Sequence, residues 1–328
     1  MKNLFFIQFF AEANVNTTTD AGLSNEMKTY YDDTLIDVAG PELIHDQFAD
    51  QRPIPKNGGK TIEFRKYDNL KPATTPLTEG VTPDGNKLSM DIITATVDQY
   101  GDYVTLSDML ILTAVDNNVV QATKALGNQA GLTLDCVTRD VLCGGTSVFY
   151  PNGITSRSQL TADSKITVPL LFDVAALLKT MHAPKIGGCY VAIAHPYVTA
   201  DIMKLDGWID ISKYGHAEQI FNGEIGKIAG IRFVESSNAK VWKSAEDNCP
   251  DGLGVFSTMF VGANAYATTE VKGGGLQTII KQLGSGQDPL NQRATVGWKA
   301  TKVSERLVEQ YMVRVESCTD ASEKVEAN

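Results

Sequence analysis

Two stretches of alternating side chains, separated by about twenty residues rich in proline and glycine, constrain the fold of this chain most. Ile62 and Phe64 alternate with charged neighbours in the first stretch, and a second alternating stretch runs over residues 90–106. A period of two is typical of strands, and a connection of this length is unusual inside a compact domain. We therefore predict an extended β-hairpin over residues 51–106 that projects from the body of the subunit.

The connecting stretch, residues 68–88, contains three prolines, two glycines and few apolar side chains. Ordering it costs about 1–2 kcal/mol per residue in backbone entropy, which its own apolar side chains do not offset. We therefore expect the loop to become ordered when it packs on a neighbouring subunit. The residues that we predict to form this contact are apolar and lie in the loop and its flanking strands: Ile62, Phe64, Leu70, Leu77, Val81, Leu88 and Ile92.

A helical period replaces the strand period after Ser107, and Gly144-Gly145 ends it. About 30 residues at about 1.5 Å each predict a rod of roughly 45 Å. The expected buried stripe recurs at spacings of three and four: Val119, Thr123, Leu126, Ala130, Thr133, Val137 and Val141.

The remaining residues predict a mixture of shorter elements. A second helix begins near Thr167, and another begins at Pro196, with His195 as its starting residue. Strands are expected at residues 189–194, 228–234 and 255–261, and in three segments after residue 276, whereas the final ten polar residues are expected to fray. The absence of repeats and of strand–helix–strand alternation predicts an α+β fold.

Charge and cysteine usage exclude some classes of function. The net charge is −10, and residues 1–50 hold 2 basic and 9 acidic side chains, so the chain lacks the basic surface with which proteins grip phosphates. Its five cysteines are dispersed and odd in number, which favours reduced thiols over a disulfide framework. The apolar N-terminal stretch is interrupted by Gln8 and is not expected to be a signal peptide; no run is long enough to span a membrane.

No motif predicts a catalytic site, a metal or a cofactor. The segment 57–61 ends like a phosphate-binding loop, but Ile54 stands where that motif needs glycine, and a strand follows where it needs a helix. The glycines at 273–275 also precede a strand, which excludes a dinucleotide-binding turn. His45, His182, His195 and His216 are scattered without the spacing of metal ligands.

Five segments resemble major capsid proteins of the coliphage N-four-like family of tailed bacteriophages. They are NEMKTYY at 25–31, RPIPKNGGKTIEF at 52–64, LTEGVTP at 77–83, QYGDYVTLSD at 99–108 and DPLNQR at 288–293. They occur in order over nearly the whole chain.

The resemblance implies the Hong Kong 97-type capsid fold and assigns a part to each region of the chain. Residues 1–50 are expected to form an N-terminal arm, residues 51–106 the extended loop, and residues 107–185 a peripheral domain with its spine helix. Residues 186–265 are expected to form the axial domain, and residues 266–328 to return to the peripheral domain and form the tail. Some members of the wider fold crosslink lysine to asparagine, but the surroundings of Lys66, Lys71 and Lys87 show no such motif.

The function that follows is assembly. We expect hexamers and pentamers of this chain to form an icosahedral virion shell in the host bacterial cytoplasm, with portal and scaffolding proteins as further partners. The shell would enclose double-stranded DNA without sequence-specific binding, and no membrane is involved. Two alternatives stay open: a nanocompartment shell of the same fold with an enzyme cargo, and a hydrolase whose site assembles only in space.

Overall fold

The computed structural model describes residues 44–67, 69–77, 79–82, 84–113, 118–210, 224–283 and 288–328. The predicted arm therefore lies largely outside the described residues. The chain divides into two compact units. The first unit contains the described residues 44–47, 99–137 and 273–302, and the second contains those in 48–98, 138–272 and 303–328. Helices and sheets are not arranged as repeating strand–helix–strand units, which confirms the α+β class.

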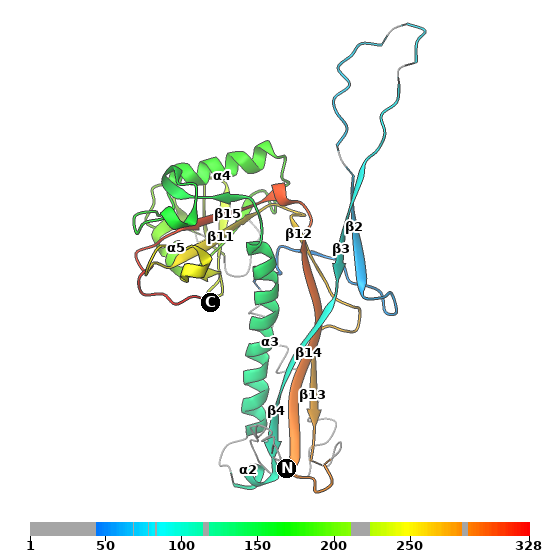
Figure 1. Ribbon diagram of the computed structural model, residues 1–328, viewed down its shortest axis with the longest axis vertical. Helices are drawn as coiled ribbons and strands as arrows, with labels where there is room; N and C mark the ends of the chain where they lie inside the picture. Colours follow the sequence, from blue (N-terminus) through cyan, green and yellow to red (C-terminus); the bar gives the residue numbers. More distant parts are fainter. Residues whose placement is uncertain are drawn as a thin grey trace, which may run out of the picture. The chain divides into compact units, whose positions relative to one another are not determined.

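In the first unit a long helix runs beside a sheet (Figure 1). The helix is α3 (Asn118–Cys143), whose residues 118–137 belong to this unit, and the short α2 (Asp108–Thr113) precedes it. The strand β14 (Arg293–Arg306) pairs with β4 (Asp98–Ser107) and with β13 (Gln277–Lys281). Side chains from α3 and the sheet, including Leu126 and Trp298, form one buried cluster.

The predicted stripe on α3 is correct in its first half and wrong in its second. Val119, Thr123, Leu126 and Ala130 are buried, but the stripe then continues through Leu134, Thr138 and Leu142. Thr133, Val137 and Val141, each one residue earlier, are only partly buried. From Leu126 onward the buried positions recur every four residues, so the stripe differs by one residue from the predicted one. Burying Thr138 costs little, because its hydroxyl forms a hydrogen bond of 2.9 Å with the hydroxyl of Ser304.

The second unit is built on an eight-stranded sheet. The order is β5 (Val148–Phe149), β15 (Met312–Ser317), β11 (Val255–Val261), β6 (Tyr190–Ala194), β9 (Ile231–Glu235), β8 (Glu224–Ile228) and β7 (Ile209–Asp210), and β10 (Val241–Trp242) pairs with β11. Every residue of β6 and β11 is buried, and apolar side chains of both strands belong to the core of this unit.

Two predicted helices pack into the core of this unit. The helix α4 (Val168–Thr180) begins at the predicted Thr167, and α5 (Pro196–Ile202) begins at the predicted proline. His195 caps α5, because its ring nitrogen Nδ1 accepts a hydrogen bond from the backbone N–H of Tyr197 at 3.3 Å. The prediction that His195 is a helix-start residue is therefore confirmed.

Two expectations for this unit are wrong. The single strand expected at residues 228–234 is the hairpin of β8 and β9, which turns at Ala229 and Gly230, both with positive φ. The final residues are not frayed, because the tail is hydrogen-bonded to the body: the backbone N–H of Gly254 donates to the carbonyl oxygen of Ser322 at 2.8 Å, and that of Val241 to the Asn328 side chain at 2.9 Å. Polar residues in a tail can be ordered by such bonds without an apolar pattern.

A smaller set of strands carries the hairpin. Within the second unit, β12 (Tyr266–Thr269) pairs with residues 303–306 of β14, and β1 (Asp50–Gln51) pairs with β12 in parallel. The hairpin itself consists of β2 (Thr61–Tyr67) and β3 (Met90–Thr96). The second predicted strand is thus divided: it ends at Thr96, Val97 is buried, and β4 continues into the sheet of the first unit.

The described part of the second unit also contains four short 3-10 helices. They are η2 (Pro151–Gly153), η3 (Arg157–Gln159), η4 (Ala245–Asp247) and η5 (Glu309–Tyr311), and η5 leads into β15.

Candidate functional site

The β2–β3 hairpin is the candidate functional site, because assembly was the function predicted for it. The two strands pair antiparallel without a bulge, from Thr61 opposite Thr96 to Tyr67 opposite Met90. A backbone hydrogen bond from Val97 to Lys60, 2.8 Å between nitrogen and oxygen, closes the base. Figure 1 shows the pair continuing into a long open loop.

The inner face of the hairpin is occupied by residues of the same chain. Phe64 is only 5% exposed and forms a buried cluster with Ala95 and Ala267, against which Val303 and Leu307 also pack. Ile62 belongs to the edge of this cluster. These contacts fix the base of the hairpin and leave Phe64 without surface for a neighbour.

The outer face is uncovered; its large apolar side chains gather at the end next to the loop, whereas Glu63 and Arg65 on the same face are charged. Because side chains alternate along a strand, Ile92 and Met90 face away from Phe64. Tyr67, which pairs with Met90, lies on the same outer face. Ile92 is 51% exposed and Tyr67 is 61% exposed. Exposed apolar side chains that gather on one face mark surfaces for contact with another molecule.

The loop beyond the strands exposes the other predicted residues. Every described residue between 69 and 92 is exposed, and those of 69–89 form no strand or helix. Leu70, Leu77, Val81 and Leu88 are among the large exposed apolar side chains. The structure therefore places Leu70, Leu77, Val81, Leu88 and Ile92 on the surface and Phe64 inside, and Ile62 between the two.

The polar anchors of α3 were not found from the sequence. The backbone N–H of His45 donates to Asp135 at 2.9 Å, and the His45 ring nitrogen Nδ1 lies 2.8 Å from the second carboxylate oxygen. Lys302 forms an ion pair with Asp46 and donates to the carbonyl oxygen of Leu134 at 2.8 Å. These residues are far apart in sequence, so no local pattern predicts that they pair. The only signal in the sequence was that histidine and acidic residue types are present. They fasten residues 45 and 46 to the first unit.

A second buried polar cluster stabilises the larger sheet. Glu316 is fully buried and accepts two hydrogen bonds of 2.7 Å from Arg157, and it pairs with Arg314 at 2.8 Å. The Arg157 guanidinium lies 3.9 Å from the centre of the Trp242 ring. Burial and the nearby Glu316 carboxylate raise the pKa of Tyr150. Charge-assisted hydrogen bonds from two arginines are strong and directional, so this cluster is suited to holding structure.

Among the described residues, the thiols and histidines form no cluster of metal ligands. All five cysteines are free, and burial raises the pKa of Cys143 and of Cys318, and that of Cys249 to about 11. In the described part of the chain, no group of three or more His, Cys, Asp or Glu is placed to hold a metal ion. His216 lies outside the described residues. No described helix has the length and apolar character required to cross a bilayer.

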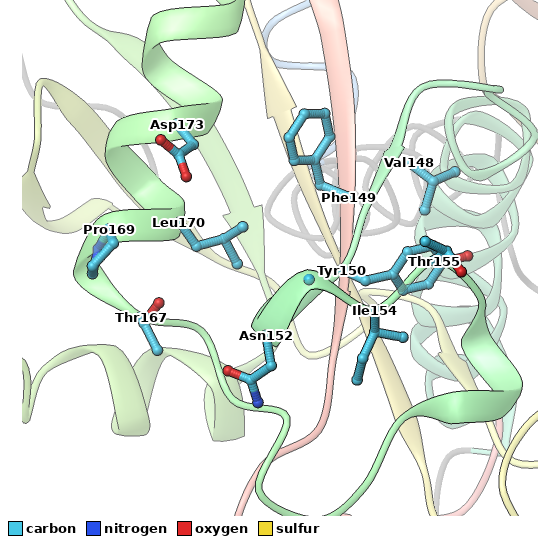
Figure 2. Close-up of a pocket in the computed structure, with 11 residues that line it drawn as sticks. Val148, Phe149, Tyr150, Asn152, Ile154, Thr155, Thr167, Pro169, Leu170 and Asp173 are labelled. Atoms are coloured by element: carbon cyan, nitrogen blue, oxygen red, sulfur yellow. The ribbon is translucent and has the colours of Figure 1, made fainter.

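The second unit also contains a pocket, shown in Figure 2, with a volume of about 660 Å³. One wall comes from β5, η2 and the residues after it, and the other from the start of α4. Phe149 and Ile154 line the first wall, and Leu170 and Asp173 line the second. The lining also includes the polar side chains of Asn152, Thr155 and Thr167.

Solved structures with the same arrangement of elements are phage capsids. The capsid of Ralstonia phage GP4 matches with a TM-score of 0.71 at 13% identity, covering 97% of this chain and 99% of that chain. The capsid of cyanophage P-SCSP1u matches with a TM-score of 0.59 at 14% identity, covering 97% and 93%. The mature capsid of bacteriophage PhiM1 matches with a TM-score of 0.54 at 12% identity, covering 96% and 93%. The fold is therefore that of a Hong Kong 97-type capsid subunit.

A model of the phage capsid protein family matches residues 91–305, which is more than half of the chain. The chain belongs to the phage capsid protein family. A search of curated protein sequences finds no match. The function is that of a major capsid protein, a structural subunit that assembles with copies of itself into the shell of the virion. The family match favours this function over the nanocompartment alternative.

Proposed function

We propose that the β2–β3 hairpin is the arm by which each copy holds its neighbour in the shell. The observation that supports this proposal is a group of exposed apolar side chains on the outer face of the hairpin, Tyr67, Met90 and Ile92, next to a loop whose described residues are all exposed. A two-stranded hairpin is only marginally stable by itself, and uncovered apolar surface favours association. Closed symmetry repeats one such contact in every subunit, so weak contacts add up to a stable shell.

The other regions take the parts that the capsid fold assigns to them. In this proposal residues 1–50 form the N-terminal arm, which is distinct from the hairpin. Residues 107–185 form the peripheral domain with α3 as its spine, and residues 186–265 form the axial domain. Residues 266–328 return to the peripheral domain and end in the tail, which supports the larger sheet through its hydrogen bonds to Gly254 and Val241.

The partners in this proposal follow from the charge of the chain and from its resemblance to coliphage N-four-like capsid proteins. The subunits form hexamers and pentamers of an icosahedral shell in the host cytoplasm, with portal and scaffolding proteins. A net charge of −10 repels DNA, so the shell encloses double-stranded DNA without binding its sequence. The subunit acts without a cofactor.

The test is a hairpin that lacks its loop. Residues 68–88 are replaced by a short Gly-Ser turn between Tyr67 and Met90, which face each other in the sheet. We expect a folded, soluble subunit that forms no shells in negative-stain images, because the base cluster around Phe64 is retained. A matched variant replaces only the exposed Leu112 of α2 by serine and should assemble normally.

Limited proteolysis gives an independent readout. We expect cleavage between residues 68 and 87 in free subunits and protection in particles, because the loop is exposed in a single copy. Normal shells from the loop-deleted variant, or equal cleavage in particles and free subunits, would show that the hairpin does not hold the neighbour.

A further inference from the structure

The pocket beside β5 lies at an edge of the eight-stranded sheet. β5 is the last strand in the order and pairs with β15 on one side, where Arg314 and Val315 lie opposite Val148 and Phe149. An edge strand offers unpaired backbone groups to an extended segment from another chain. The pocket therefore offers a sheet edge for backbone hydrogen bonds and a cavity for a side chain.

Buried residues of the same unit support both walls of this pocket. Tyr150 lines it and lies against the buried Glu316, which is fixed by Arg157 and Arg314. The opposite wall is α4, whose Leu171 and Val174 are fully buried in the core. A preformed site binds without first having to order itself, which reduces the entropic cost of association.

The pocket has a mixed lining with one acidic side chain: Phe149, Ile154 and Leu170 are apolar, and Asn152, Thr155 and Thr167 are polar. Asp173 is its one charged lining residue; it is exposed and forms no ion pair with any described residue. A suitable occupant is an extended segment that places an apolar side chain inward and a cationic side chain outward. Adjacent residues of an extended chain point to opposite sides, so the two side chains should be neighbours in sequence.

The hairpin of this chain contains two such pairs, Leu70-Lys71 and Lys87-Leu88, but Pro72 follows the first and has no backbone N–H with which to pair along a strand edge. Leu88 is 70% exposed, has no strand partner, and follows Lys87, which is also exposed. At the tip of the loop, Leu77 and Val81 instead flank Glu79, whose charge Asp173 would repel.

We propose that the pocket between β5 and α4 of one copy receives residues 87–88 of a second copy, with Leu88 inside the pocket and Lys87 against Asp173. The inference rests on the proposed function, because it names the surface that the hairpin grips. The extended backbone of residues 86–89 lies along the outer edge of β5. Contacts of this kind are heterologous, so they generate rings and shells and not only pairs.

Disulfide trapping tests the contact directly. Leu88→Cys is combined with Thr155→Cys, which lines the pocket, and particles assembled under reduction are then oxidised. We expect a ladder of covalent oligomers on a non-reducing gel. The two single variants control for the native thiols, and Leu77→Cys with Thr155→Cys is the matched control from the loop tip. None of these three should give the ladder.

If the cysteine variants do not assemble, exchanging the charges of Lys87 and Asp173 tests the same contact. Asp173→Lys and Lys87→Asp should each raise the protein concentration needed for assembly about three- to fivefold, as expected for loss of one exposed ion pair. The double variant should return to the wild-type value. Asp206→Lys, an exposed change elsewhere in the same unit, should leave assembly unchanged.

The outcomes separate this inference from the proposed function. No ladder from the 88–155 pair in formed particles, an equal ladder from the 77–155 pair, or assembly that is indifferent to Asp173→Lys would each overturn the pocket contact. Failure of both single charge variants without recovery in the double variant would overturn it as well. If the loop-deleted protein forms normal shells, the hairpin proposal itself fails.

Discussion

Replacing Phe64 by alanine should detach the hairpin without unfolding the body of the subunit. Phe64 is almost fully buried against Ala95 and Ala267. The short alanine side chains cannot fill the space that the ring leaves, and such substitutions cost about 3–5 kcal/mol in protein cores. We take about 3 kcal/mol here, because the cluster is small and lies at the edge of the unit.

The loss should be local. The eight-stranded sheet has its own core, which does not include Phe64, and regions of a protein can open separately. Since about 1.4 kcal/mol changes an equilibrium constant tenfold, amide exchange in β2 and β3 should become roughly a hundredfold faster. Exchange in β6 and β11 should stay unchanged. Hydrogen–deuterium exchange with mass spectrometry on free subunits measures both.

The matched control is Ile92→Ala on the outer face of the same hairpin. Ile92 is half exposed, so its loss should change exchange in the hairpin by less than about threefold while assembly is weakened. Equal effects of the two substitutions on exchange would refute the division of the hairpin into a buried and a free face. So would loss of protection across the whole second unit in Phe64→Ala.

Three further predictions concern the body of the subunit. Glu316→Ala leaves Arg157 and a second arginine without their buried partner, and should lower the free energy of unfolding by about 3–5 kcal/mol in urea titrations; an unchanged midpoint would contradict the buried cluster. Burial lowers the pKa of His195 to about 4, below the roughly 6.5 of an unfolded chain. The unfolded state then binds more protons, so stability should fall by about 1–2 kcal/mol as pH drops from about 6.5 to about 4, and His195→Asn, which keeps the cap, should flatten this slope. Five thiols should react in denatured protein, whereas Cys249, with a pKa of about 11, should alkylate slowly at pH 8 in the native subunit; rapid native alkylation would refute its burial.

Local periodicity was enough to predict the elements that carry the function. The alternation around Ile62 and Phe64 predicted β2, the spacing from Val119 to Ala130 predicted α3, and Pro196 predicted the start of α5. These patterns are readable because strand and helix periods depend on a few neighbouring residues. The absence of repeats and of strand–helix–strand alternation was sufficient to predict the α+β class.

Pairings between distant residues were decided only in the tertiary structure. Asp135 and Thr138 interrupt the apolar pattern of α3, yet both are buried because His45 and Ser304 satisfy them. The polar tail is ordered for the same reason, through hydrogen bonds to residues such as Val241 that lie far away in the chain. A sequence pattern does not report a polar partner that arrives from another segment.

The two faces of the hairpin show this division most clearly. From the sequence, Phe64 and Ile92 are equivalent: each is a large apolar residue in an alternating strand. The pairing register places them on opposite faces, and Ala267, Val303 and Leu307, some two hundred residues later, cover one face and leave the other free. The sequence by itself determined that a hairpin would form and that it would carry large apolar side chains. Which of its apolar side chains are available to a neighbour depends on what the rest of the chain packs against it, and only the tertiary structure contains that information.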